Sequence, residues 1–146
     1  MSNESSQLDA QFSGTKSVAD ALRFDEKALE TWMKAHVDGY AGPLEVSQFR
    51  GGQSNPTYKL TTPARQYVLR RKPPGVLLPS AHAVEREFTV MKALGEAGFP
   101  APIMYGLCED ADVIGTAFYV MEFVEGRIFW DAYLPGMEPA ERRAIY

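Results

Sequence analysis

The sequence predicts an α+β domain in which an antiparallel sheet of about five strands carries a packed helix. Short β-prone apolar runs are separated by brief Gly- and Pro-containing turns, and a segment with clear helical periodicity interrupts them. The 146 residues, 45% hydrophobic and 23% charged, are ordinary for one soluble domain and sufficient to bury a sizeable core.

The first half of the chain predicts one helix and three strands. Residues 1–24 are expected to form a disordered N-terminal extension, because the chain begins with a polar stretch. Asp25 is a candidate N-cap for a helix that ends near Gly39. Strands are expected at 46–50, 55–62 and 66–72, with a hairpin at 62–64 joining the last two.

The second half predicts a longer helix, two strands and further helices. Ser80 is a candidate N-cap for a helix over 81–97, in which apolar residues recur at helical spacing before Gly98 and Pro100. Strands are expected at 103–108 and 117–124. Helical segments are expected from 126 to 133 and again from Pro139.

Composition argues against several classes of function. The net charge of −4 does not suit general nucleic-acid binding, which needs a basic surface. No apolar run approaches a membrane span, so no membrane partner is expected. The single cysteine, Cys108, excludes an intramolecular disulfide and favours the cytoplasm. With only two histidines besides, a soft structural metal site is unfavourable.

Basic residues gather in one segment of this acidic chain. Between Val46 and Val84 there are six Lys or Arg residues and no Asp or Glu. Such a segment suits a small polyanion such as a nucleotide triphosphate. Cations on solvated edge strands would give the same pattern, and charge alone leaves both interpretations open. The six are Arg50, Lys59, Arg65, Arg70, Arg71 and Lys72.

Three neighbouring segments suggest a clamp for nucleotide phosphates. The first is a glycine-rich turn whose backbone N–H groups could approach a phosphate, although an ordinary hairpin turn has the same composition. Arg70 shares a strand face with Val68, where a cation needs a counter-charge or a ligand. Glu87 lies in the apolar stripe of the following helix and is the expected partner of Arg70. The turn comprises Gly51, Gly52, Gln53, Ser54 and Asn55.

Other polar residues near the clamp have simpler interpretations. A purely structural ion pair is the alternative for Arg70 and Glu87, and Arg70 alone could be an edge residue whose charged end extends into solvent. Arg71 and Lys72 are expected to be solvated, and His82 is expected to be a structural or surface residue.

Together these segments resemble the N-terminal lobe of the protein-kinase-like fold. The closest resemblance is to the aminoglycoside phosphotransferase (APH) family, which includes choline kinases, and in detail to the kinase-like domain fused to some acyl-CoA dehydrogenases. The motifs that carry it are residues 49–58, 67–75, 85–88 with 91–102, and 118–126.

The resemblance implies ATP as the cofactor and a role for each motif. Residues 51–55 match the loop that covers the phosphates. Arg70 matches the strand cation that contacts the α- and β-phosphates, and Glu87 matches the helix glutamate that holds this cation. Met121 matches the residue that guards the adenine pocket, while Glu122 and Val124 match the hinge positions whose backbone pairs with adenine.

The family's catalytic motif, His-Gly-Asp followed by Asn, is absent, as is its later metal-binding Asp. In the family both belong to a second lobe. We therefore interpret 25–124 as the nucleotide-binding lobe and 125–146 as the hinge exit with the first helices of a truncated second lobe. No catalytic residue or metal ligand is expected in this chain, and Mg²⁺ is expected only with the second lobe.

The expected partners follow from this division. Besides the nucleotide, the resemblance implies a small-molecule alcohol substrate bound through the second lobe. The chain itself is expected to self-associate through apolar residues that would otherwise meet that lobe. The alternative function is a non-catalytic binding or interaction module. The apolar residues are Phe123, Ile128, Phe129, Trp130 and Tyr133.

Overall fold

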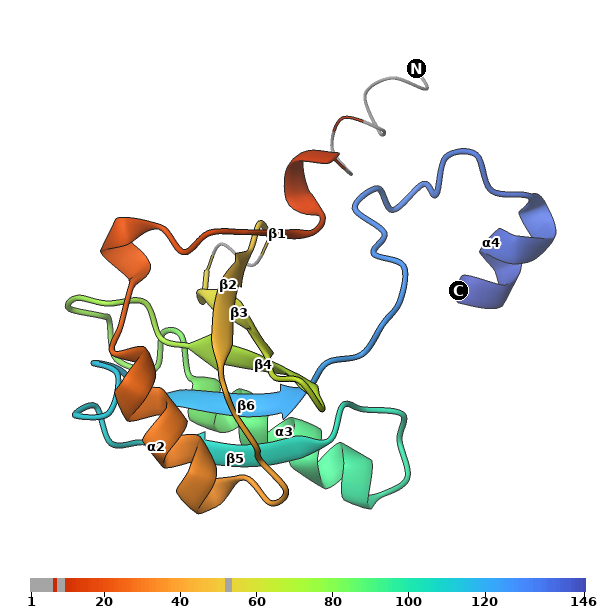
Figure 1. The fold of residues 1–146 in the computed structure, drawn as a ribbon. Helices are drawn as coiled ribbons and strands as arrows, with labels where there is room; N and C mark the ends of the chain where they lie inside the picture. Colours follow the sequence, from red (N-terminus) through yellow and green to blue (C-terminus); the bar gives the residue numbers. More distant parts are fainter. Residues whose placement is uncertain (1–6, 8–9, 52–53) are drawn as a thin grey trace.

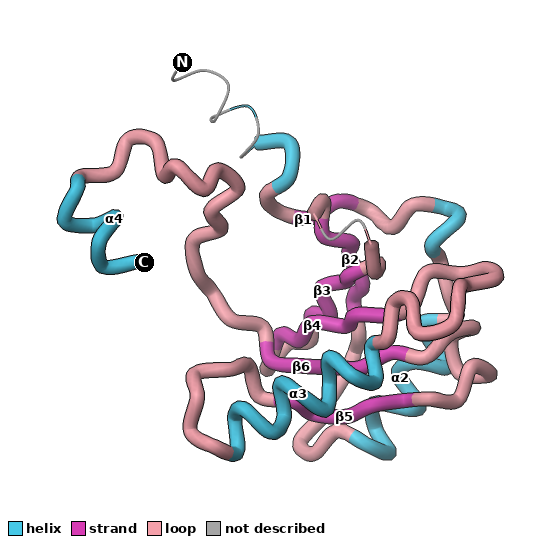
Figure 2. Tube along the Cα trace, turned by 180° about the vertical axis from the view of Figure 1, so that it is seen from behind, coloured by secondary structure: helices cyan, strands magenta, loops and turns pink. Residues whose placement is uncertain are grey.

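The computed structural model describes residues 7, 10–51 and 54–146, and it contains a six-stranded antiparallel sheet with a helix on each face (Figures 1 and 2). The predicted α+β class is confirmed, and the sheet has one strand beyond the five identified in the sequence. In chain order the elements are β1 (Thr15–Lys16), η1 (Asp20–Leu22), α2 (Glu26–His36), β2 (Glu45–Phe49), β3 (Thr57–Thr61), β4 (Gln66–Arg71), α3 (Val84–Glu96), β5 (Met104–Cys108), β6 (Phe118–Glu122) and α4 (Pro139–Ile145).

The strands lie in the order β1-β2-β3-β4-β6-β5, and every neighbouring pair is antiparallel. The predicted hairpin between β3 and β4 is confirmed, because the Thr62 hydroxyl donates a hydrogen bond to the Arg65 carbonyl at 2.8 Å. After β4 the chain passes through α3 to β5, and β6 then lies between β4 and β5. This insertion places Tyr119 of β6 directly opposite Arg70 of β4.

Side chains alternate along the central strands, and β6 contributes to two separate cores, one on each face of the sheet. On one face, Leu29, Trp32 and Met33 of α2 pack against the sheet in the larger core. On the other face, Val84 of α3 packs in a smaller core with Tyr119. The strand residues of the larger core are Tyr58, Leu60, Tyr67, Leu69, Cys108, Phe118 and Val120.

Arg71 belongs to the α2 face, and the prediction that it would be solvated is wrong. It is 2% exposed, because the alternation of β4 places it on the same face as Tyr67 and Leu69. Its guanidinium donates to the carbonyls of Ile114 at 3.1 Å and Leu22 at 3.3 Å. The same group lies 5.3 Å from the ring centroid of Phe24, so carbonyls and an aromatic ring stabilise its charge, and no described residue supplies an acid to it.

The helix ends follow local signals with one exception. Asp25 is confirmed as the N-cap of α2, since its carboxylate accepts from two backbone N–H groups at 3.0 Å. Helix α3 does not begin at Ser80. Both Ser80 and His82 have positive φ, 66° and 55°, which excludes them from a right-handed helix, and Ala83 at the N-cap position offers no side-chain oxygen.

Two segments beside the sheet differ from the prediction. Within the extension expected at 1–24, the described residues include β1, which pairs with Phe49 and Gln48 of β2. The prediction of a helix at 126–133 is wrong, because this segment is irregular and leads away from β6 towards α4 (Figure 1). Ile128 and Trp130 line the same cavity, and side chains two positions apart do not share a helix face.

Two negative findings apply to the part of the chain that the structure describes. None of its helices combines the length and apolar character needed to cross a membrane. Within the same residues, no three His, Cys, Asp or Glu side chains are grouped so that they could hold a metal ion.

Candidate functional site

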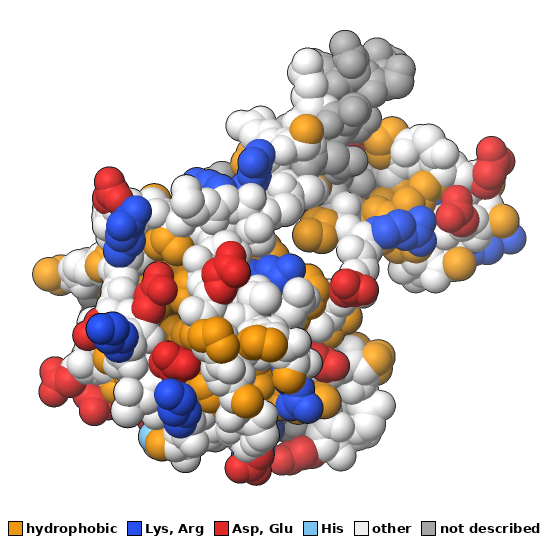
Figure 3. All heavy atoms as spheres, in the orientation of Figure 1, with side chains coloured by type: hydrophobic (Ala, Val, Ile, Leu, Met, Phe, Trp, Pro, Cys, Tyr) orange, Lys and Arg blue, Asp and Glu red, His pale blue; other side chains and the backbone are white. Residues whose placement is uncertain are grey.

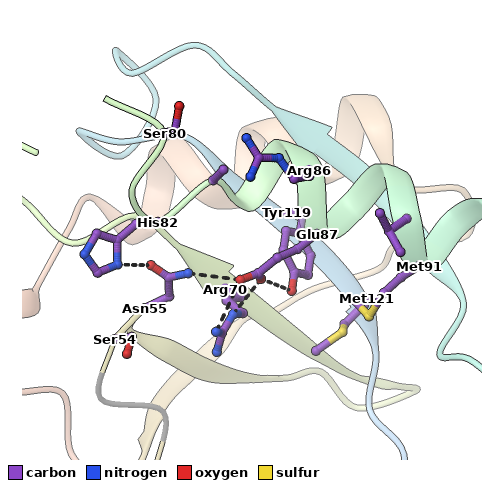
Figure 4. Close-up of a pocket in the computed structure, with 12 residues that line it drawn as sticks. Ser54, Asn55, Arg70, Ser80, His82, Arg86, Glu87, Met91, Tyr119 and Met121 are labelled. Atoms are coloured by element: carbon purple, nitrogen blue, oxygen red, sulfur yellow. Dashed lines mark hydrogen bonds and ion pairs between the residues drawn. The ribbon is translucent and has the colours of Figure 1, made fainter. Parts of the chain in front are cut away.

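The Glu87 carboxylate is the centre of a hydrogen-bonded cluster on the α3 face of the sheet (Figure 4). Arg70 Nε donates to its Oε2 at 2.8 Å, and Arg70 Nη2 donates to its Oε1 at 3.4 Å. The predicted contact between these two residues is therefore confirmed. Tyr119 donates to Oε2 at 2.9 Å and Asn55 Nδ2 to Oε1 at 3.2 Å.

These contacts fill the acceptor capacity of Glu87. A carboxylate has two oxygens with about four lone-pair positions, and Glu87 accepts four hydrogen bonds, two on each oxygen. The donors come from β4, from β6 and from the turn before β3. Glu87 therefore has the contacts of a residue that orients its neighbours, with no lone pair left over for a ligand.

Arg70 is fixed but retains donors. A guanidinium has five N–H groups. Within the described residues, Arg70 uses two on Glu87 and one on the Thr57 hydroxyl, at 3.3 Å. Its side chain is 26% exposed, and that of Glu87 is 35% exposed. Two N–H donors of a partly buried, oriented cation are thus left for a ligand.

The surrounding groups keep the charges of the cluster in place. Burial raises the pKa of Tyr119, and the negative charge of Glu87 raises it further, so the phenol remains a donor at neutral pH.

Lys72, predicted to be solvated, contacts the carboxylate of Glu85. Burial alone would raise the pKa of Glu85, but the hydrogen bond from Lys72 outweighs it together with smaller favourable contributions, and the pKa is lowered.

Two cavities meet at Arg70. The larger, which we call the α3 cavity, has a volume of about 770 Å³. Its polar end includes Asn55, His82 and Glu87, and its apolar wall is formed by Val90, Met91 and Met121. The smaller, the Trp130 cavity, has a volume of about 240 Å³ and is lined by residues that include Phe49, Gly51, Thr57, Ile128 and Trp130. Arg70 lines both.

The structure brings part of the predicted clamp into one cavity, together with Met121 of the predicted adenine pocket. Ser54, Asn55, Arg70, Glu87 and Met121 all line the α3 cavity. They come from the turn before β3, from β4, from α3 and from β6, and Figure 4 shows Asn55 and Arg70 converging on Glu87, whereas Ser54 lies apart.

The other predicted site residues lie outside the α3 cavity or are not among the residues that the structure describes. Gly51 lines the Trp130 cavity, and a Cβ at this position would lie 2.6 Å from Trp130 Cη2, so only glycine allows the indole to approach. Gly52 and Gln53 lie outside the described residues. Glu122 donates its backbone N–H to the Ile103 carbonyl at 2.8 Å, and Val124, just beyond β6, is 60% exposed.

Sequence reasoning missed three members of the cluster, Tyr119, His82 and Thr57. Alternation within β6 indicated which face Tyr119 would occupy, but not that β6 would pair with β4. His82 Nδ1 lies 2.9 Å from Asn55 Oδ1, in a turn whose positive φ has no signal in hydrophobic periodicity.

Comparison with protein families gives a match over most of the chain. The model of the phosphotransferase enzyme family, APH, matches residues 45–146. Among curated relatives, mouse (Mus musculus) acyl-CoA dehydrogenase family member 10 is 51% identical over 133 residues, which cover 90% of this chain and 12% of the relative. Human acyl-CoA dehydrogenase family member 11 is 49% identical over 140 residues, 91% of this chain and 18% of the relative.

A solved structure is also similar. It is a crystal structure from Ralstonia eutropha of a protein assigned as an aminoglycoside phosphotransferase, with a TM-score of 0.68 and 58% sequence identity. The similarity covers 84% of this chain and 35% of that one. The chain thus spans less than a fifth of the curated relatives named above and about a third of the solved one.

Proposed function

Because this chain belongs to the phosphotransferase enzyme family, we propose that it is the nucleotide-binding lobe of an ATP-dependent small-molecule O-phosphotransferase. The observation that carries the proposal is the state of Arg70, which is oriented by Glu87, keeps two N–H donors and lies at the junction of two cavities. A guanidinium held in this way presents its planar fork to phosphate oxygens.

Each residue of the site has a distinct part in the proposal. Arg70 binds oxygens of the α- and β-phosphates, and Glu87 orients Arg70 without contacting the nucleotide. Gly51 and Ser54, both within the glycine-rich turn, bring backbone close to the phosphates. These phosphates would lie beside the basic segment between β2 and α3, whose excess of positive charge favours them.

The adenine would lie at the exit of β6. Met121 borders this position from the α3 cavity. The N–H of Glu122 is already bonded to Ile103, which leaves the Glu122 carbonyl to accept from the adenine amino group. The N–H of Val124, two residues on, would donate to the ring. Both contacts use backbone atoms, so they would tolerate changes of side chain.

Phosphoryl transfer itself needs a group that receives the hydroxyl proton and ligands for Mg²⁺. We assign both, with the alcohol substrate, to a second lobe. An aminoglycoside is one candidate; the acyl-CoA dehydrogenase names of the relatives make a hydroxyacyl-CoA at least as good a candidate. The alternative remains a binding module without catalysis, which would be favoured if the full-length sequence lacked the family's His-Gly-Asp motif.

We further propose that the protein is cytoplasmic and that the isolated chain self-associates. A cytoplasmic location is consistent with the single cysteine, Cys108, which is buried and unpaired. Apolar side chains gather on the segment that follows β6, seen to the right in Figure 3. We propose that the isolated chain self-associates there, and light scattering would reveal a mass above that of the monomer. The exposed apolar residues are Ile128, Phe129, Trp130 and Tyr133.

The proposed function is tested by ATP titration calorimetry on the full-length protein and by turnover with Mg²⁺ and a panel of alcohols. Arg70→Met should weaken ATP binding about tenfold or more, the loss expected for a charge-assisted contact. Arg65→Met is the matched control, because Arg65 is an exposed arginine of the same basic segment at the β3–β4 turn.

The outcomes separate the two functions. ATP binding with turnover supports the phosphotransferase, and ATP binding with no turnover on any alcohol supports the binding module. Absence of ATP binding by the full-length protein would overturn the proposal. The isolated 146-residue chain should bind ATP weakly and transfer no phosphate.

A further inference from the structure

We infer that His82 and Asn55 are positioning residues that hold the Glu87 carboxylate and join the glycine-rich turn to helix α3. Asn55 donates to Glu87 Oε1 at 3.2 Å, and His82 Nδ1 lies 2.9 Å from Asn55 Oδ1. The three side chains form one chain of hydrogen bonds at the polar end of the α3 cavity (Figure 4). The effect of these hydrogen bonds on catalysis rests on the proposed function, whereas the hydrogen bonds themselves are independent of it.

The direction of each hydrogen bond follows from the carboxylate. A carboxylate that already accepts from Arg70 and Tyr119 can only accept from Asn55 as well, so the Asn55 amide nitrogen must face Glu87. The Asn55 oxygen then faces His82 and needs a donor. His82 must therefore carry a proton on Nδ1, which both the neutral Nδ1–H tautomer and the imidazolium provide.

Both the side chain and the backbone at Asn55 are held by hydrogen bonds. It is 2% exposed, and a buried amide requires partners for both of its ends. Its carbonyl accepts from the Thr57 hydroxyl at 3.0 Å, and the next carbonyl, of Pro56, accepts from the Arg71 N–H at 3.1 Å. The side chain is thus committed to Glu87 and His82, so we assign Asn55 to positioning and not to direct contact with a phosphate.

His82 reaches Asn55 through an unfavourable backbone. Its φ of 55° lies in the left-handed region, which is rare for residues other than glycine and is accepted more readily by Asn, Asp and His. Its carbonyl accepts from the N–H of Val84, the first residue of α3. The turn before α3 therefore directs the imidazole to Asn55 at a conformational cost, which is typical of functional sites.

The chain of hydrogen bonds couples two parts of the clamp. Asn55 is the last residue of the glycine-rich turn, and Glu87 is the residue that orients Arg70. A displacement of Asn55 towards a bound phosphate would move its amide, and with it one of the four hydrogen bonds on Glu87. Binding at the turn and the orientation of Arg70 are in this way linked through a single side chain.

Three substitutions of His82 separate the side chain from its backbone. His82→Ala removes the imidazole and keeps the strained φ, whereas His82→Gly removes it and relaxes the backbone. His82→Asn keeps a donor close to the Nδ1 position in a residue that tolerates positive φ. His36→Asn serves as the control, since His36 lies on α2, on the opposite face of the sheet, where its ring hydrogen-bonds to the Trp32 carbonyl and stacks on the Trp32 ring.

ATP affinity and kcat/KM of the full-length protein are the functional readouts. His82→Gly and Asn55→Ala should each lower them about fivefold, the effect of one lost hydrogen bond. His82→Asn should remain within about twofold of the wild type, and His36→Asn should be unchanged. A merely structural His82 would change the melting temperature of the His82→Gly protein without changing its ATP affinity at a temperature where it is folded, and this result would overturn the inference.

Long-range ¹H–¹⁵N NMR spectra of the 146-residue chain test the hydrogen bonds without reference to ATP. They should show a proton on Nδ1 of His82, and the resonance should change in Asn55→Ala. A neutral His82 with its proton on Nε2 alone would overturn the inference. If the wild-type full-length protein binds no ATP while this NMR pattern is present, the proposed function fails and the hydrogen-bonded chain stands.

Discussion

Arg70 and Arg71 are consecutive residues of β4, and the two faces of the sheet stabilise their charges in different ways. Arg71, on the α2 face, is 2% exposed and bonded to two backbone carbonyls beside the ring of Phe24. Arg70, on the α3 face, is bonded to Glu87 and lines two cavities. The outer surface of the α2 side carries acidic and basic side chains in alternation and no concentration of positive charge (Figure 3).

The comparison shows that burial alone does not identify a functional cation. The partners of Arg71 are neutral and enclosed, so its interactions contribute to the stability of the fold. Arg70 has a charged partner whose own acceptors are saturated, together with donors that face open space. The role proposed for Arg70 thus rests on an oriented charge that, within the described residues, keeps unused donors next to a cavity.

The largest expected effect would come from Arg71. Arg71→Met should lower the free energy of unfolding by about 2–4 kcal/mol, because it leaves the Ile114 carbonyl without its donor, removes one of the two donors of the Leu22 carbonyl and removes the contact with Phe24. The ATP affinity of the folded protein should be unchanged. Urea denaturation and calorimetry measure the two quantities. A loss of ATP affinity with little loss of stability would reverse the roles we give to the two arginines.

Glu87→Gln should have the next largest effect, and it should act on binding. The amide removes the charge and presents a donor to Arg70, so ATP affinity or kcat/KM should fall about tenfold. The cost in stability should be within about 1 kcal/mol, because the pair is solvent-accessible. Glu96→Gln, the same change at an exposed site on α3, is the control. Equal ATP binding and turnover in the two variants would leave Glu87 a purely structural role.

Arg70→Lys should give a smaller loss than Glu87→Gln. Lysine keeps the positive charge but replaces the planar fork with a single ammonium group, so it cannot bond Glu87 and a phosphate with the same geometry. We expect about threefold weaker ATP binding, measured by calorimetry at constant ionic strength. A gain in affinity would show that charge alone determines binding at this position.

The smallest expected effect is on the free energy of unfolding at alkaline pH, where a tyrosine on each face of the sheet contributes. Burial raises the pKa of both Tyr119 and Tyr58; Glu87 raises that of Tyr119 further, whereas Arg71 opposes the rise at Tyr58. A raised pKa in the folded state gives stability that is complete below about pH 10, the value for unfolded tyrosine, and is lost as the pH rises further. Tyr119→Phe should therefore flatten the alkaline loss of stability in pH-dependent urea unfolding; an unchanged slope would contradict it.

The sequence predicted those parts of the site that depend on neighbouring elements. The contact between Arg70 and Glu87 joins a strand to the helix that follows it, and both lay on faces that periodicity identifies. Tyr119 and His82 were missed for physical reasons. Tyr119 reaches Glu87 only because β6 lies between β4 and β5, and His82 reaches Asn55 only through a left-handed backbone.

The predictions that were wrong also failed because of long-range contacts. Trp130 packs against Phe12, with ring centroids 5.3 Å apart, and donates to the Ser13 hydroxyl, so the segment expected to be helical follows contacts with the N-terminal region. Strand β1 likewise exists through its pairing with β2. Arg71 was expected in solvent because local sequence does not show that carbonyls and aromatic rings would surround it.

The insertion of β6 between β4 and β5 also has a consequence for how the chain folds. Strands β2, β3 and β4 are consecutive and pair through short connections, whereas the pairing of Arg70 with Tyr119 closes a long loop that contains α3 and β5. Closure of a long loop costs more entropy and is slower than formation of a hairpin. The cluster around Glu87 is therefore complete only when β6 has joined the sheet, and a bound nucleotide should slow global unfolding without protecting the β2–β4 hairpins by themselves.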